Sequence, residues 1–113
     1  MIELTALEEM FDSIRENTDW DIDGPMLWGY FFLDPSRSKL EQLASILQEN
    51  GYNVVDIYVP EHEEGEAESH CLHVERVESH TARSLDDRNH EFYALAGRLG
   101  VALYDGMDVG PTE

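Results

Sequence analysis

The clearest pattern in the chain is the run from Met26 to Leu33, which is apolar or aromatic at nearly every position. Gly24-Pro25 precedes it and Asp34-Pro35 follows it, and such boundaries predict a strand rather than a helix. Because successive side chains of a strand point to opposite faces, two rows are expected. One row contains Leu27, Gly29, Phe31 and Leu33, and the other contains Trp28, Tyr30 and Phe32. We interpret this run as the central strand of a sheet, both of whose rows need cover.

Three other segments carry apolar residues at helical spacing, which predicts helices over about residues 5–17, 35–50 and 84–99. Gly51 and Gly100 are expected to end the second and third helices. The expected N-terminal caps are Thr5 with Glu8 in a capping box, Asp34 followed by Pro35, and Ser84 with Asp87.

Three further strands are expected over residues 54–59, 70–80 and 101–109. In the middle one of these, Leu72 and Val74 lie on one side but Val77 has the opposite parity, so a β-bulge near Glu75 or Arg76 is expected. The turn Asp105-Gly106 is expected to interrupt or end the last strand.

Apart from the first helix, the order of elements is strand, helix, strand, strand, helix, strand. With right-handed crossovers this order predicts an α+β fold: a ferredoxin-like βαββαβ antiparallel four-stranded sheet with an extra N-terminal helix, in one domain spanning residues 1–113. Two helices would cover one face of the sheet and leave the other open.

The missing side chain of Gly29 would allow close approach of the helices, so we place Gly29 on the helix side and Trp28, Tyr30 and Phe32 on the open face. Tyr58 and Asp56, and His73 and Glu75, are candidates to join them. The first helix has an apolar stripe of its own and could lie across these aromatics, giving helices on both sides of the sheet. Burial under that helix and use as a protein-binding face remain as alternatives for the aromatic row.

Charge is the unusual feature of the composition. Twenty-five Asp and Glu against seven Lys and Arg give a net charge of −18, while 42% hydrophobic residues are typical of a folded chain. This field disfavours direct nucleic-acid binding and favours a basic protein surface as partner. Residues 61–69 are expected to form a solvated hairpin loop that steers such a partner, with five acidic side chains at Glu61, Glu63, Glu64, Glu66 and Glu68.

A single cysteine, Cys71, cannot form an internal disulfide, and the N-terminus lacks a basic segment followed by an apolar one. No apolar run approaches the roughly 20 residues of a membrane-spanning helix. We therefore expect a cytoplasmic protein without membrane association.

Two stretches resemble metal sites. Residues 19–24 match the start of a calcium loop, but position twelve is Tyr30 where a bidentate Glu is needed, so a polar turn is favoured. His70, Cys71, His73 and Glu75 look like a zinc cluster, but a regular strand sends His70 and His73 to opposite faces. No phosphate-binding loop or nucleophile motif is present in the sequence, so we expect no cofactor and no catalysis. A metal- or ligand-binding protein or enzyme that uses the His73 and Glu75 face is the alternative.

Two short motifs, one in the middle of the chain and one near its C-terminal end, indicate a family. The segment from Leu95 to Gly106, together with Asn50-Gly51-Tyr52-Asn53-Val54, resembles the regulators of ribonuclease E activity, type B. The resemblance covers about residues 28–111, although Met107 to Pro111 lacks a further aromatic that the family carries. It implies an acidic, ferredoxin-like protein that binds the endoribonuclease and inhibits RNA decay without catalysis or cofactor.

The leading hypothesis is therefore a non-enzymatic acidic regulator that binds a basic protein surface, with an endoribonuclease as the candidate partner. The expected binding residues are those of the open face and the acidic loop: Trp28, Tyr30, Phe32, Tyr58, His73, Glu75, Glu61, Glu63, Glu64, Glu66 and Glu68. A homodimer that pairs through the open face is a further alternative.

Overall fold

The computed structural model describes residues 2–60 and 69–112, so the expected acidic loop at 61–68 lies outside the described residues. The described part is a mixed α/β structure with three helices and a four-stranded antiparallel sheet. Its elements are α1 (Leu4–Asn17), β1 (Met26–Asp34), α2 (Arg37–Glu49), β2 (Asn53–Tyr58), β3 (His70–Glu78), α3 (Ala82–Leu99) and β4 (Leu103–Gly110).

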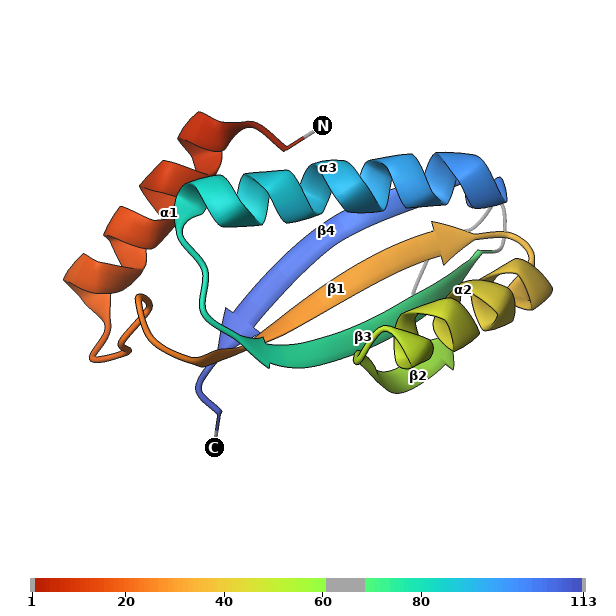
Figure 1. The fold of residues 1–113 in the computed structure, drawn as a ribbon, viewed down its shortest axis with the longest axis horizontal. Coiled ribbons are helices and arrows are strands. Elements are labelled where there is room, and N and C mark those ends of the chain that lie inside the picture. Colours follow the sequence, from red (N-terminus) through yellow and green to blue (C-terminus); the bar gives the residue numbers. More distant parts are fainter. Residues whose placement is uncertain (1, 61–68, 113) are drawn as a thin grey trace.

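The strands lie in the order β2-β3-β1-β4, so the apolar run of β1 occupies an interior position, as its composition predicts (Figure 1). β1 pairs with β3 without a break from Met26 opposite Glu78 to Asp34 opposite His70. The bulge expected near Glu75 or Arg76 is therefore wrong. The irregularities lie instead in β2, between Val54 and Asp56, and in β4, opposite Phe31 and Phe32.

All three helices lie on one side of the sheet (Figure 1). α2 and α3 cover it directly, and α1 packs chiefly against α3. Phe11 of α1 stacks on Trp28 with ring centroids 5.9 Å apart. The first helix does reach the aromatic row, as one alternative expected, but it does so from the same side as the other helices. The expected arrangement with helices on both faces is therefore wrong for the described residues.

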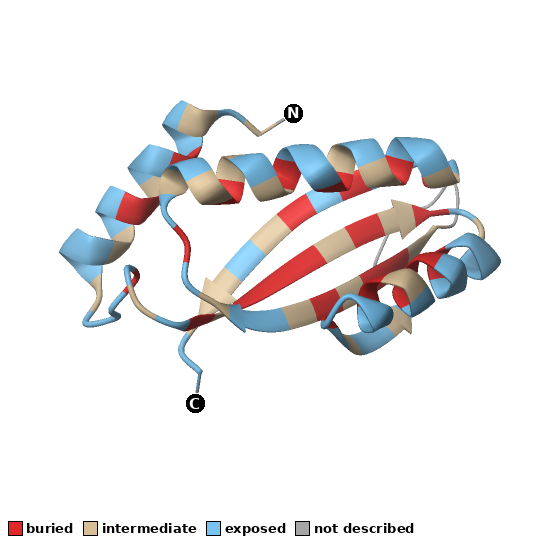
Figure 2. Ribbon diagram, viewed as in Figure 1, coloured by how far each residue is buried: buried red, intermediate tan, exposed pale blue. Residues whose placement is uncertain are grey.

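The aromatic row of β1 forms the centre of the core. Trp28, Tyr30 and Phe32 are each 0% exposed, whereas Leu27, Phe31 and Leu33 of the other row are of intermediate burial. Figure 2 shows buried and intermediate stretches along β1. Phe92 of α3 packs edge-on against Tyr30 at 4.9 Å and against Phe32 at 5.3 Å. The expectation that these three side chains occupy the open face is wrong, because the largest apolar surfaces of the strand are the ones that the helices bury.

Gly29 explains the inverted assignment. It faces away from the helices, and a Cβ at this position would collide with Asp108 Oδ1 and would lie 2.9 Å from His73 Nε2. The missing side chain therefore makes room for two polar side chains on the opposite face and not for a helix.

The helix ends differ from the expected caps. α1 begins after Glu3 without a side-chain cap, so the Thr5 and Glu8 capping box is wrong. Ser36, not Asp34, caps α2. Asp34 instead accepts hydrogen bonds from the backbone N–H groups of Ser36 (2.7 Å) and Ala102 (2.8 Å), which ties the end of β1 to the start of β4.

At α3 the capping box is formed by Thr81 and Ser84, so Ser84 is the third helical residue and not the cap. Gly100 ends α3 with a φ of 70°, as predicted, because a left-handed residue there is most easily a glycine.

Candidate functional site

The face of the sheet away from the helices carries an apolar strip. We define this open face by Leu27, Gly29, Phe31 and Leu33 of β1, Cys71, His73, Glu75 and Val77 of β3, Asp56 and Tyr58 of β2, and Leu103 and Asp108 of β4. Val77 is 55% exposed, Leu103 45% and Tyr58 37%. Among the described residues no helix packs on this strip, so its apolar side chains are available to a partner.

Carboxylates surround the apolar strip. Asp56 and Asp108 are exposed on the two outer strands, and Glu75 lies between them, where its Oε1 accepts a hydrogen bond of 3.4 Å from Asn53. The strand positions that define the open face include no Lys or Arg. The face therefore combines apolar contact area with negative charge, which suits a partner surface with apolar and basic side chains.

His73 and Tyr58 lie on this open face, but on the side of the sheet opposite to Trp28, Tyr30 and Phe32, with which they were expected to share a face. The His73 ring stacks on Phe31 at 4.4 Å, with 15° between the ring planes. Tyr58 lies opposite Cys71 in the pairing of β2 with β3, and its interaction with the thiol raises the pKa of Tyr58 to about 12. Burial raises the pKa of the Cys71 thiol, so this cysteine is a packed side chain and not a reactive thiolate.

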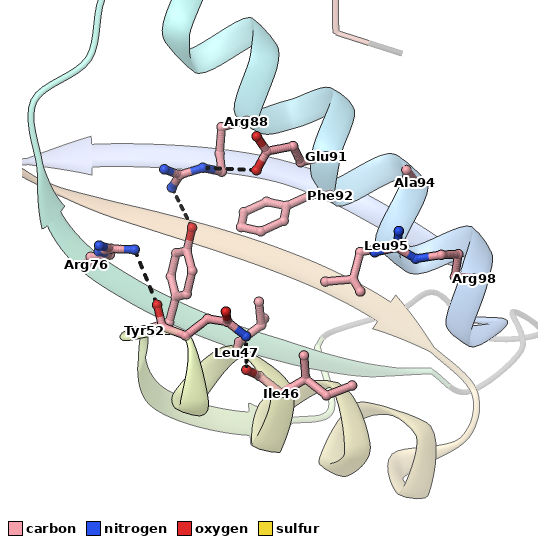
Figure 3. Close-up of a pocket in the computed structure, with 11 residues that line it drawn as sticks. Ile46, Leu47, Tyr52, Arg76, Arg88, Glu91, Phe92, Ala94, Leu95 and Arg98 are labelled. Carbon is pink, nitrogen blue, oxygen red and sulfur yellow. Dashed lines mark hydrogen bonds and ion pairs between the residues drawn. The ribbon is translucent and has the colours of Figure 1, made fainter.

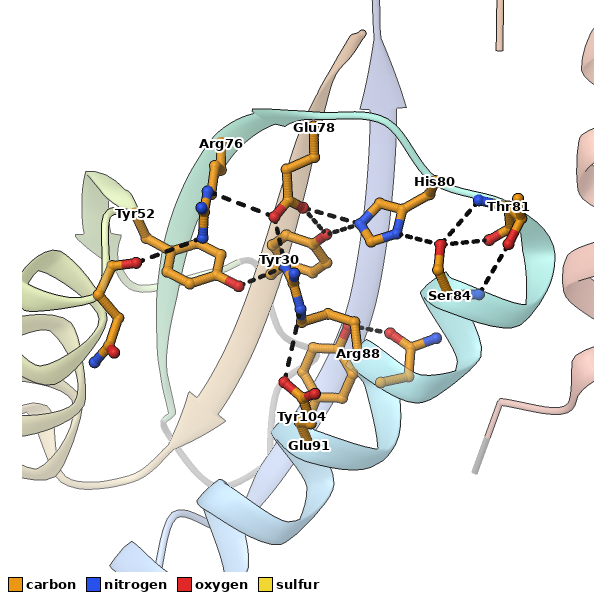
Figure 4. Close-up of polar contacts among 12 residues, drawn as sticks. Tyr30, Tyr52, Arg76, Glu78, His80, Thr81, Ser84, Arg88, Glu91 and Tyr104 are labelled. Carbon is orange, nitrogen blue, oxygen red and sulfur yellow. Dashed lines mark hydrogen bonds and ion pairs between the residues drawn. The ribbon is translucent and has the colours of Figure 1, made fainter. Parts of the chain in front are cut away.

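The opposite face holds a polar network that the sequence analysis did not identify, centred on Glu78 (Figure 4). Tyr30 donates to Glu78 Oε2 at 2.7 Å, and His80 Nε2 lies 2.9 Å from the same oxygen. Arg88 binds the other oxygen, Oε1, at 2.6 Å. The second ring nitrogen of His80 lies 2.9 Å from Ser84 Oγ, which links the network to the capping box of α3.

This network strongly perturbs two acids. Burial alone would raise the pKa of Glu78, but the hydrogen bonds of His80, Tyr30 and Arg88 outweigh it and lower the pKa to about 2. Burial and the hydrogen bond to Glu78 raise the pKa of Tyr30 well above its ordinary value. Because Glu78 is held ionised by three donors inside the fold, we assign the network to stability.

The two stretches that resemble metal sites bring no such site together in the described part of the chain. Within it, no group of three or more His, Cys, Asp or Glu side chains is arranged to hold a metal ion. Cys71, His73 and Glu75 share a face, as the alternation predicts. In the calcium-like turn, Asp23 Oδ1 pairs with Arg15 at 2.6 Å and Ile22 is buried. That contact fits the polar turn.

The predicted binding residues are thus divided among three places. Tyr58, His73 and Glu75 lie on the open face, Trp28, Tyr30 and Phe32 lie in the core, and the five Glu of the acidic loop lie outside the described residues. The face also contains five apolar residues that were not among the predicted binding residues: Leu27, Phe31, Leu33, Val77 and Leu103. The parity of Val77 was the available signal, because it showed apolar character on the side of the strand that also carries His73.

Residues 5–109 match a family model described as regulator of ribonuclease activity B. No curated protein matches the chain significantly. In the described part of the chain, every helix is too short or too polar to cross a lipid bilayer.

Proposed function

The chain belongs to the regulator of ribonuclease activity B family, and from this premise we propose that it is a non-enzymatic regulator that binds an endoribonuclease through its open face. Membership of this family implies that the protein regulates the activity of a ribonuclease. Direct binding of an endoribonuclease, and the surface used, are our proposal.

The exposed apolar strip with its carboxylates carries this proposal. Val77, Leu103 and Tyr58 would supply the apolar contact, and Asp56, Glu75 and Asp108 would attract Lys or Arg of the partner. The net charge of −18 supports a basic protein surface and opposes an RNA backbone. Regulation would then follow from contact with the enzyme rather than with its substrate.

The antiparallel order β2-β3-β1-β4, with helices after β1 and β3, supports a ferredoxin-like arrangement to which α1 is added. We further propose a cytoplasmic protein without cofactor. The most strongly perturbed carboxylate, Glu78, is occupied by internal donors on the helix side, which supports a structural role for it rather than an acid-base role.

Two substitutions and one matched control test the surface. Val77→Ser and Leu103→Ser change exposed valine and leucine side chains on the open face, whereas Val59→Ser changes a valine that is 47% exposed and lies outside the strands. With a purified endoribonuclease of the ribonuclease E type, each open-face variant should weaken binding by roughly fivefold or more. The control should bind as the wild type does, and inhibition of RNA cleavage should follow affinity.

Equal binding by all three variants would exclude the open face as the contact surface. If the wild type, without the ribonuclease, sedimented as a dimer and Val77→Ser as a monomer, the open face would instead be the contact surface between two copies of the chain.

The steering role proposed for the acidic residues 61–68 rests on the charge of the sequence alone and is tested separately. Replacing Glu61, Glu63, Glu64, Glu66 and Glu68 by Gln should slow association with the ribonuclease and flatten its salt dependence. The dissociation rate should change little. Surface-binding kinetics at several salt concentrations measure both quantities, and unchanged on-rates and salt slopes would remove the steering role.

A further inference from the structure

A second candidate binding site lies on the helix side of the molecule, between α2 and α3 (Figure 3). It is a groove of about 520 Å³, a size common for ligand sites. Its apolar lining comes from Leu47, Tyr52, Phe92 and Leu95. The open face contributes none of its residues, so this site is independent of the proposed ribonuclease contact.

The charge of the groove is opposite to that of the chain. Arg76 of β3 and Arg88 and Arg98 of α3 line it, so three of the seven basic residues of the protein meet here. Glu91 is the one carboxylate among the lining residues. The groove is thus a positively charged region on a protein whose net charge is −18, and such a region attracts negatively charged groups.

Internal pairing accounts for only part of this excess. Arg88 binds Glu78 at 2.6 Å and lies 3.8 Å from Glu91, and Arg76 lies 3.6 Å from the same oxygen of Glu78. Both guanidinium groups also pack over the Tyr52 ring, at 5.2 Å for Arg76 and 5.6 Å for Arg88. Arg98 is exposed, and none of the ion pairs among the described residues includes it, so its side chain is available to an external anion.

The arrangement has cations at two ends and apolar side chains between them. Figure 3 shows Arg76 and Arg88 near Tyr52, while Arg98 lies toward the C-terminal end of α3, beyond Leu95. An occupant that satisfies every part must carry negative charge at both ends and an apolar group in the middle. A long polyanion such as RNA fits poorly, because it would extend over the acidic remainder of the surface.

We propose that the groove between α2 and α3 binds a short acidic peptide segment whose carboxylates pair with Arg76 at one end and Arg98 at the other, and whose apolar side chain packs against Phe92 and Leu95. Arginine suits this role, because its planar guanidinium can bind a carboxylate through two hydrogen bonds. The regulator would then present two surfaces of opposite selectivity, one for basic and one for acidic segments.

The test uses a fluorescein-labelled hexapeptide, Asp-Glu-Leu-Phe-Glu-Asp, and its uncharged counterpart, Asn-Gln-Leu-Phe-Gln-Asn, with the full-length protein in a fluorescence anisotropy titration. Arg98→Gln should weaken binding of the acidic peptide by roughly fivefold to tenfold. Arg83→Gln is the matched control, because it removes the same charge from an exposed position of α3 that does not line the groove. It should bind the acidic peptide as the wild type does.

Leu95→Ser tests the apolar part and should also weaken binding, whereas a site for simple anions would be insensitive to it. Equal affinity of Arg98→Gln and Arg83→Gln, or equal binding of the two peptides, would overturn the proposal. Full displacement of the peptide by inorganic phosphate at matched concentration would overturn it too, since that outcome assigns the groove to a small anion. Endoribonuclease binding should be unchanged in Arg98→Gln, which separates this site from the open face.

Discussion

The two faces of the sheet are built from the same strands but meet different surroundings. On the helix side, β1 contributes Trp28, Tyr30 and Phe32, all fully buried, and Glu78 of β3 is surrounded by donors. On the open face, β1 contributes only half-buried apolar side chains, and Asp56 and Asp108 of the outer strands are exposed. Alternation along a strand therefore determines which residues share a face, and the apolar area of the side chains determines which face the helices bury.

The largest expected loss of stability follows from a substitution on the helix side of the sheet. Trp28→Ala removes a fully buried ring that stacks on Phe11, and should lower the free energy of unfolding by roughly 3–5 kcal/mol. Val77→Ala on the open face should cost no more than about 0.5 kcal/mol. Urea denaturation followed by circular dichroism measures both. Similar losses for the two variants would mean that the open face is as well packed as the core.

A second prediction concerns charge on the two faces. Glu78→Gln weakens hydrogen bonds to a buried carboxylate and should cost roughly 2–3 kcal/mol at neutral pH, because bonds to charged groups are the stronger ones. Glu75→Gln makes the same change of charge on the open face and should stay within about 0.5 kcal/mol of the wild type.

The pH dependence of stability sharpens the same contrast. The pKa of Glu78 is lowered in the folded state, to about 2 from an ordinary 4.5, so its stabilising contribution is present above the ordinary pKa. That contribution, on the order of 3 kcal/mol, is lost as the pH falls from about 4.5 to about 2. The difference between wild type and Glu78→Gln should therefore shrink over this range in denaturation curves taken at successive pH values. A constant difference would contradict the assigned role of Glu78.

Gly29 should show a smaller effect than Trp28 or Glu78. An alanine there would push aside the side chains of Asp108 and His73, whose far ends can move, so the cost should be about 1 kcal/mol. Gly110→Ala is the control, because no atom outside its chain neighbours lies within 4 Å of the added Cβ. Thermal melting compares the two variants. A loss of several kcal/mol at Gly29 would show that this part of the open face is rigidly packed.

The order of helices and strands could be predicted from the sequence, because periodicity and terminal glycines act locally. Gly100 ends α3 as expected, and β1 has the expected central position. The orientation of β1 could not be obtained in this way. Either of its rows can face a helix, and Gly29 favoured the wrong one because the two side chains that cross it, Asp108 and His73, come from other strands.

The candidate sites show the same limit. Tyr58, His73 and Glu75 were candidates for a face shared with the aromatic row of β1, but the pairing of the strands places them on the opposite face, which depends on contacts between distant segments. The groove between α2 and α3 could not be predicted, because Arg76, Arg88 and Arg98 meet only after β3 and α3 have packed together. The Glu78 network likewise joins residues that are 48 positions apart in sequence, as in its bond to Tyr30.

The weak attachment of α1 should affect the rate at which its backbone amides exchange with solvent. This helix has no side-chain N-terminal cap, and it is held mainly by its contact with α3, by Phe11 on Trp28, and by the hydrogen bond of 3.0 Å from the Ile2 N–H to the Tyr93 hydroxyl. Its amide protons should therefore exchange with solvent through an opening that leaves the sheet intact, well before those of β1. Each such opening admits water to the Trp28 indole, whose Nε1 has no hydrogen-bond partner among the described residues of the closed form. Hydration of the indole N–H lowers the free-energy cost of opening α1. The slowest-exchanging amide protons should therefore be those of the paired strands and not those of α1.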